Sequence, residues 1–208
     1  MTTTTTVAPP TDSTTTVVVS TTTPTSTTTA PVDFRAVHWD DVEVPGSVCL
    51  ASQPIQLTHG DATISTPPDL NSATPQVDIS ASLPVVYGDL YGTGRDVAAL
   101  NVFCATTGGT ADGQLQDSWV IFADNAGTLD ALTTLTPQQP PAAGSHVPIL
   151  SSEQGGIVIQ PGKITVQEGW YGQNDFTCCP TGQATMVWTF SGGAFTPATT
   201  VQAYPKGG

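Results

Sequence analysis

The side chains that could carry out acid–base, nucleophilic or metal chemistry are isolated from one another in this sequence. A nucleophile needs a base beside it, and a metal site needs ligands at short, regular spacing. The histidines His38, His59 and His146 lie singly in predicted loops, outside any H-E-x-x-H pair, and no G-x-S-x-G elbow occurs. We therefore expect solvent-exposed histidines and a protein that is not an enzyme, without catalytic residues, cofactor or metal.

Paired carboxylates keep one enzymatic alternative open. Asp40 with Asp41, or Glu168 with Asp175, could serve as the acid and base of a glycoside hydrolase. Because the chain contains 17 Asp and Glu residues, pairs of this kind arise from composition alone. A secreted hydrolase with an unrecognised site is accordingly the alternative to a binding function.

The four cysteines predict disulfide bonds, and with them export to an oxidising compartment: Cys49, Cys104, Cys178 and Cys179. A bond between the adjacent Cys178 and Cys179 is strained, and the pair lacks the C-x2-C spacing of zinc sites. Cys49 could therefore bond to Cys104, Cys178 or Cys179. We favour the pairing in which Cys49 and Cys104 are each bonded to one member of the adjacent pair, which closes two long loops.

Aromatic residues beside the double cysteine form a candidate ligand-binding loop. Trp170, Tyr171 and Phe176 lie in a Gly- and Asn-containing segment, where their rings could stack on a sugar or a peptide. The favoured alternative is structural: Trp170 and Phe176 plug the open end of a sheet, while Trp119 and Trp188 fill its core.

The charge balance excludes several classes of partner. Lys and Arg number 4 against 17 acidic residues, for a net charge of −13. Nucleic acid and anionic lipid headgroups are therefore not expected as partners, because no phosphate-binding face can be assembled from the basic residues. The acidity itself is typical of a solvated surface, and the abundant hydroxyl and amide side chains suit an extracellular protein. The basic residues are scattered along the chain: Arg35, Arg95, Lys163 and Lys206.

Residues 1–32 differ in composition from the rest of the chain. Half of them are Thr, and four are Pro, so the segment cannot bury enough apolar surface to offset the entropy of ordering. We expect a disordered, semi-extended Thr/Pro/Ser-rich linker able to carry O-linked sugar. Such linkers follow a secretion signal or a lipid-modified Cys. We therefore expect surface tethering, with any membrane attachment through a lipid anchor upstream of Met1.

Residues 33–203 are predicted to form one disulfide-stapled domain, followed by a disordered tail over 204–208. The domain shows apolar and polar alternation interrupted by Gly, Pro and Asn, and no long helical period. We expect an all-β antiparallel meander forming a curled sheet, an open barrel or a small sandwich, with hairpin turns at 124–127, 161–162 and 191–193. The predicted strands are 56–58 with 62–65, 76–83, 85–87, 96–104, 118–123, 129–135, 157–160, 163–167, 184–190 and 194–199.

Residues 88–96 resemble the calcium loop of FG-GAP and VCBS repeats, in which alternate carboxylates converge on one cation. Asp89 matches that pattern, but Tyr91 and Thr93 stand where the repeats carry Asp or Asn, and Val97 replaces the closing acid. We therefore expect a Gly-rich turn whose amides are capped by the Asp89 carboxylate, and no calcium binding.

A wider resemblance covers nearly all of the folded region. The chain resembles actinobacterial exported lipoproteins of the LppP/LprE type, in the segments 33–35, 56–62, 85–100, 108–109, 178–180 and 187–190. The resemblance implies a β-rich domain in the cell envelope and no defined biochemical activity. We therefore expect an exported, non-catalytic envelope protein that binds a glycan, a peptide or a partner protein. A purely structural envelope spacer is a further alternative.

Overall fold

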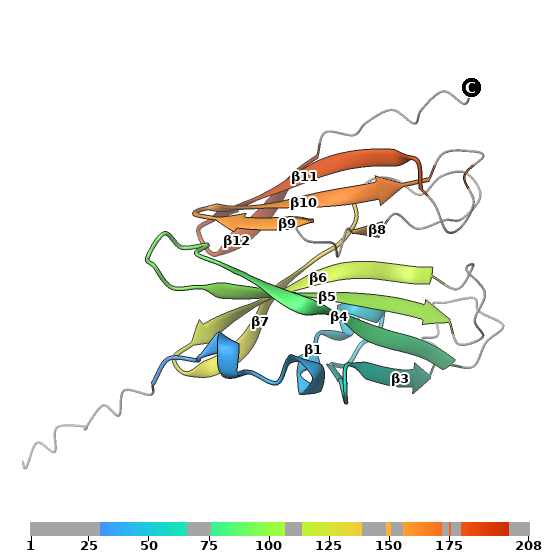
Figure 1. Cartoon of the computed structure of the whole chain (residues 1–208), viewed down its shortest axis with the longest axis horizontal. Helices are drawn as coiled ribbons and strands as arrows, with labels where there is room; N and C mark the ends of the chain where they lie inside the picture. The colour runs from blue at the N-terminus through green and yellow to red at the C-terminus, as the bar shows by residue number, and fades with distance from the viewer. Residues whose placement is uncertain are drawn as a thin grey trace, which may run out of the picture.

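The computed structural model describes residues 30–65, 76–106, 114–138, 149–150, 156–171, 175 and 180–199 (Figure 1). These residues form antiparallel β-strands and short 3-10 helices, which confirms the predicted all-β class. None of the helices in this part of the chain has the length and apolar character of a membrane-spanning segment. Nearly all of the predicted linker, residues 1–29, and the predicted tail, 204–208, lie outside the described residues.

The strands build two five-stranded sheets and a short ribbon. The first sheet is a meander of β3 (Asp61–Ser65), β4 (Gln76–Gly88), β5 (Val97–Thr106), β6 (Gln114–Asn125) and β7 (Thr128–Leu135). In the second sheet β10 (Lys163–Trp170) is paired on one side with β11 (Gly182–Ser191), which continues to β12 (Ala194–Thr199), and on the other with β8 (Ile149–Leu150) and β9 (Ile157–Gln160). The ribbon joins β1 (Glu43–Val44) to β2 (Ile55–Gln56).

Turn chemistry accounts for the predicted hairpins, all three of which are present. The connections β6–β7, β9–β10 and β11–β12 fall at the predicted positions. Gly192 and Gly193 adopt φ of 60° and 82°, a region that glycine enters without steric cost. In the first sheet, register shifts in each of its three longest pairings increase the local twist and curl the sheet.

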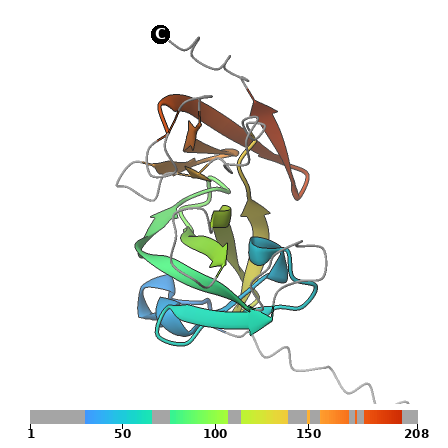
Figure 2. The same ribbon diagram turned by 90° about the vertical axis from the view of Figure 1, so that its right-hand side faces the viewer.

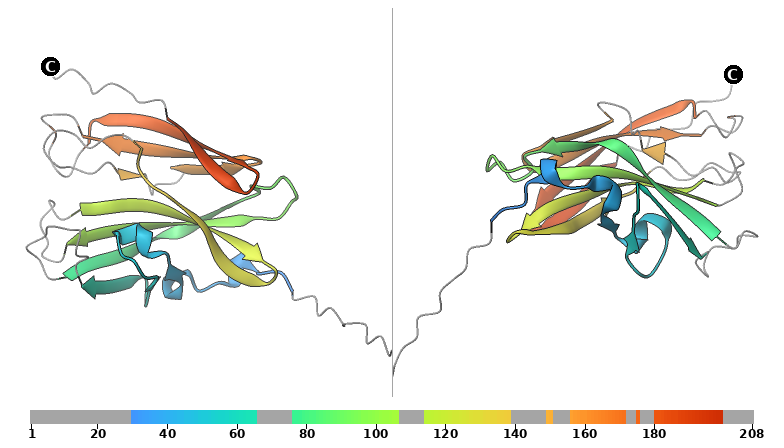
Figure 3. Two further views of the ribbon diagram at one scale, coloured as in Figure 1. Left: turned by 180° about the vertical axis from the view of Figure 1, so that it is seen from behind. Right: turned by 60° about the horizontal axis from the view of Figure 1, so that its bottom comes forward.

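The two sheets face each other, so the fold is a small sandwich with a third layer (Figures 1 and 2). One apolar core lies between the sheets and includes Trp119 and Trp188, as predicted. A second core lies on the other side of the first sheet, which the N-terminal segment (residues 30–57) covers (Figure 3). There Trp39 packs edge-on against Phe122, with ring centroids 5.2 Å apart. The N-terminal segment holds η1 (Phe34–Ala36), η2 (Trp39–Asp41) and η3 (Gly46–Cys49).

The disulfide bond corrects the favoured cysteine pairing. Cys49 at the end of η3 is bonded to Cys104 of β5, with the two Cα atoms 5.5 Å apart, so neither is available to Cys178 or Cys179. The reason is the alternation of side chains along β5, which turns Cys104 toward the N-terminal segment and away from the second sheet. Cys178 and Cys179 lie outside the described residues.

Candidate functional site

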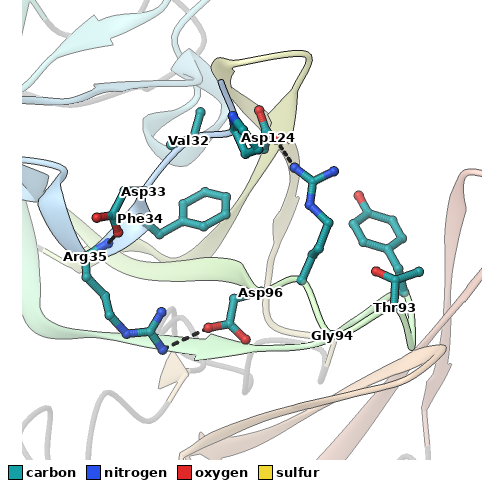
Figure 4. A pocket seen from close by; sticks show the side chains of 11 residues that line it. Val32, Asp33, Phe34, Arg35, Thr93, Gly94, Asp96 and Asp124 are labelled. Carbon is teal, nitrogen blue, oxygen red and sulfur yellow. Dashed lines mark hydrogen bonds and ion pairs between the residues drawn. The ribbon is translucent and has the colours of Figure 1, made fainter. Parts of the chain in front are cut away.

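A pocket of about 570 Å³ lies where the N-terminal segment enters the fold. One wall consists of residues 31–35, and the other comes from residues 91–96 in the loop that joins β4 to β5, named here the 89–96 loop. Figure 4 shows the side chains of Arg35 and Asp96 meeting on one side of the pocket and Asp124 on the other. The lining residues are Pro31, Val32, Asp33, Phe34, Arg35, Tyr91, Thr93, Gly94, Arg95, Asp96 and Asp124.

The first wall is anchored by local hydrogen bonds and ring packing. The Asp33 carboxylate caps η1 by accepting the N–H of Arg35 at 3.1 Å. Phe34 is buried and lies nearly parallel to Trp39, whose indole N–H donates to the Phe34 carbonyl at 3.0 Å. The Arg35 guanidinium lies 4.7 Å from the centre of the Tyr87 ring. These contacts make residues 33–35 a fixed part of the fold.

The second wall is shaped by Asp89. Its carboxylate accepts the backbone N–H groups of Gly94 at 2.7 Å and Thr93 at 3.1 Å. These hydrogen bonds, the Gly94 one above all, hold the pKa of Asp89 below its usual value. The capping role predicted for Asp89 is thereby confirmed.

The second sheet also holds the 89–96 loop in place. The N–H of Gly162, in the turn between β9 and β10, donates to the carbonyl of Leu90 at 2.8 Å. The Tyr91 ring packs edge-on against Phe190 of β11, with centroids 5.5 Å apart. Tyr91 is nevertheless 44% exposed, and its partial burial raises the pKa of its phenol. Both sheets and the N-terminal segment thus contribute to the geometry of the pocket.

Two ion pairs connect the elements around the pocket. Arg35 Nη2 lies 2.8 Å from Asp96 Oδ2, and Arg95 is hydrogen-bonded to Asp124. The Asp124 carboxylate also accepts the N–H of Gly127 at 2.7 Å and a backbone N–H of Val32, and these bonds lower the pKa of Asp124, that of Gly127 most. The side chains of Arg35 and Arg95 are 64% and 58% exposed, so both keep N–H groups directed to solvent.

The described residues of the candidate aromatic loop, Trp170 and Tyr171, do not line this pocket. Trp170 and Tyr171 are only 2% and 3% exposed, at the end of β10. The Trp170 ring lies directly over Gly182 of β11, where a Cβ atom would come within 2.2 Å of it. Neither ring presents a face to solvent, and Phe176 lies outside the described residues. A ligand-binding loop built from these three residues stays a prediction.

The histidines and paired carboxylates that the structure describes do not line the pocket. His38 and His59 are exposed, as expected, and His146 is outside the described residues. Asp41 accepts the backbone N–H of His59, and Asp175 accepts the N–H of Thr181 at 2.7 Å.

Glu168, by contrast, is 1% exposed and accepts the N–H of Gln138 at 3.2 Å. In the part of the chain that the structure describes, no group of three His, Cys, Asp or Glu could hold a metal ion.

Sequence reasoning missed this pocket because its residues lie far apart in the chain. Arg35 and Asp96 are 61 positions apart, and Arg95 and Asp124 are 29 apart. One signal was present: Arg35 and Arg95 are two of only four basic residues in a strongly acidic sequence. Their positions in the sequence are scattered, but the fold brings both to this pocket, from opposite sides (Figure 4).

Comparisons with protein-family models, with curated proteins and with solved structures found no match for this chain.

Proposed function

We propose that this chain is an exported, non-catalytic protein of the cell envelope that recognises a ligand in the pocket between residues 31–35 and the 89–96 loop. One observation carries the proposal. Arg35 and Arg95 line this pocket together with carboxylates and the exposed Tyr91. These two arginines are half of the basic residues of a chain with net charge −13. Its volume, about 570 Å³, falls within the range of about 300 to 1,000 Å³ that ligand pockets occupy.

The chemistry of the lining favours binding over catalysis. Among the described residues that line the pocket there is neither His nor Cys, and the hydroxyl groups belong to Tyr91 and Thr93. A general acid at neutral pH needs a raised carboxyl pKa, but the pKa of Asp124 is lowered by its hydrogen bonds to backbone N–H groups and to Arg95. Asp124 is therefore better suited to holding Arg95 and accepting hydrogen bonds than to transferring a proton.

Two features support export to the envelope. The Cys49–Cys104 bond joins positions 55 residues apart and lies in the buried core, as structural disulfides of secreted proteins do. The second feature is the predicted Thr/Pro-rich linker, which would attach on the pocket side of the domain, since Pro31 and Val32 line the pocket. A linker at that point would leave the remaining faces of the domain free of the cell surface.

Chemical-shift mapping on the oxidised 208-residue chain tests this proposal. Three classes of soluble probe are titrated separately: uncharged oligosaccharides, oligogalacturonate and mixed tetrapeptides. We expect one class to shift the amides of Phe34, Arg35 and residues 91–96, and this shift to be lost in Arg95→Ala. Val158→Ala, an exposed position on β9, is the matched control and should respond as wild type. Shifts confined to other parts of the domain, or no shifts with any class, would overturn the proposed site.

A further inference from the structure

We infer that the ligand of this pocket is an uncharged glycan, held by the Arg35–Asp96 pair and Arg95 and stacked on Tyr91. This inference rests on the proposed function and adds the chemical class of the ligand.

The charge of the lining favours a neutral ligand. Among the described lining residues, three carboxylates, Asp33, Asp96 and Asp124, accompany two guanidinium groups, which gives these residues one net negative charge in a strongly acidic protein. An anionic ligand would therefore meet a repulsive field despite the two arginines. A cationic ligand would have to compete with Arg35 and Arg95, which already pair with two of the three carboxylates.

The Arg35–Asp96 pair matches the hydrogen-bonding pattern of a sugar. Its donor and acceptor atoms are 2.8 Å apart, and the two side chains are 64% and 29% exposed. A guanidinium has several N–H groups and a carboxylate accepts at both oxygens, so the pair retains an exposed donor beside an exposed acceptor. Hydroxyls on adjacent carbons of a sugar ring lie about one hydrogen-bond length apart, and each can donate and accept. Arg35 can thus donate to one hydroxyl while Asp96 accepts from its neighbour.

Arg95 supplies a second contact from the opposite rim. Its partner Asp124 has a side chain only 8% exposed and accepts from Gly127, Val32 and Arg95 itself. Asp124 is therefore a positioning residue: it fixes the guanidinium without contacting the ligand. The exposed N–H groups of Arg95 are left to donate to ring or hydroxyl oxygens.

Tyr91 provides the surface for stacking. Tyr91 is 44% exposed, and the edge-on contact of its ring with Phe190 fixes its orientation before any ligand arrives. The C–H groups on one face of a sugar pack well against the electron-rich face of an aromatic ring. A platform fixed in advance costs little conformational entropy on binding.

The same walls disfavour a peptide ligand. Peptides commonly add a strand to a free sheet edge or insert an apolar anchor into a pocket. Here one wall is the η1 region and the other is the 89–96 loop, so neither presents a strand edge. The only large apolar side chain of the first wall is Phe34. It is 6% exposed and its ring already packs against Trp39, so it offers no apolar pocket for a peptide anchor.

Calorimetry on the oxidised 208-residue chain tests the ligand class. The probes are uncharged gluco-, manno-, galacto- and arabino-oligosaccharides, with oligogalacturonate and mixed tetrapeptides as the charged-sugar and peptide classes. We expect at least one uncharged oligosaccharide to bind, with an affinity that changes less than about twofold between about 50 and 500 mM NaCl, because no ligand charge is screened.

Single variants test the hydrogen-bonding residues and the stacking residue separately. Asp96→Ala and Arg95→Ala should each weaken binding about tenfold or more, since each removes hydrogen bonds that involve a charged group. Tyr91→Ala removes the stacking ring and should lose binding. Val158→Ala is the control on β9, and circular dichroism verifies that each variant is folded.

Binding at the pocket by oligogalacturonate or peptides alone would overturn the glycan inference and leave the proposed function intact. Absence of pocket binding by all three classes would contradict both.

Discussion

The guanidinium of Arg35 and the carboxylate of Asp96 are joined at 2.8 Å although they lie 61 positions apart in the chain. One belongs to the segment that enters the fold, and the other ends the loop before β5. The pair closes one side of the pocket with groups that are exposed and polar. Its main contribution is therefore expected in recognition and not in stability.

Asp96→Asn tests that distinction. Exposed ion pairs contribute about 0 to 1 kcal/mol, so the variant should lower the free energy of unfolding by less than about 1 kcal/mol. Chemical denaturation of the wild-type and variant chains measures this difference. A loss of several kcal/mol would mean that the pair is a structural element of the domain.

Peptide mapping of the exported, unreduced protein should recover Cys49 linked to Cys104. Because the bond spans 55 residues, replacing both cysteines with Ser should cost about 4 kcal/mol of stability in the chain-entropy model. Chemical denaturation of the wild-type and Cys49→Ser/Cys104→Ser chains measures this loss in the free energy of unfolding. A Cys49 peptide linked to Cys178 or Cys179 would contradict this pairing.

Gly182→Ala should disrupt the second sheet. Gly182 is paired with Trp170 across β10 and β11, and an added Cβ would lie 2.2 Å from the Trp170 ring. Because the ring is buried, it has little room to move, and we expect a loss of about 2 kcal/mol or more. The exposed neighbour Gln183, changed to Ala, is the control and should melt as wild type. Equal melting temperatures for the two variants would refute this packing.

Acid should weaken the 89–96 loop through Asp89. Hydrogen bonds from the N–H of Gly94 and its neighbours lower the folded-state pKa of this carboxyl below 3.8, so its ionised form favours folding. That contribution is complete above the unfolded pKa of about 4 and is lost as the pH falls through the folded pKa. Asp89→Asn should therefore be less stable than wild type at neutral pH, with the difference shrinking below about pH 4.

Thermal melts of both chains from about pH 7 to pH 2 measure this difference, since unfolded Asp titrates within that range. A difference that stays constant across the range would show that ionisation of Asp89 does not stabilise the fold.

Local signals predicted the strands and turns, whereas relations across the fold escaped sequence reasoning. Alternation along 96–104 and 118–123 and the turn residues at 191–193 act over a few positions, and β5, β6 and the β11–β12 hairpin follow them. Alternation along β5 sets the face on which Cys104 lies, but no local pattern specifies that the N-terminal segment covers this face. The meeting of Arg35 with Asp96 likewise depends on where the N-terminal segment crosses the first sheet.

A crystal structure of the oxidised chain with the tightest-binding uncharged oligosaccharide would show directly whether a glycan occupies this pocket. We expect sugar density between residues 31–35 and 91–96, with hydroxyls on Arg35, Asp96 and Arg95 and one ring face on Tyr91. Sugar density at another surface, with this pocket unchanged, would contradict it.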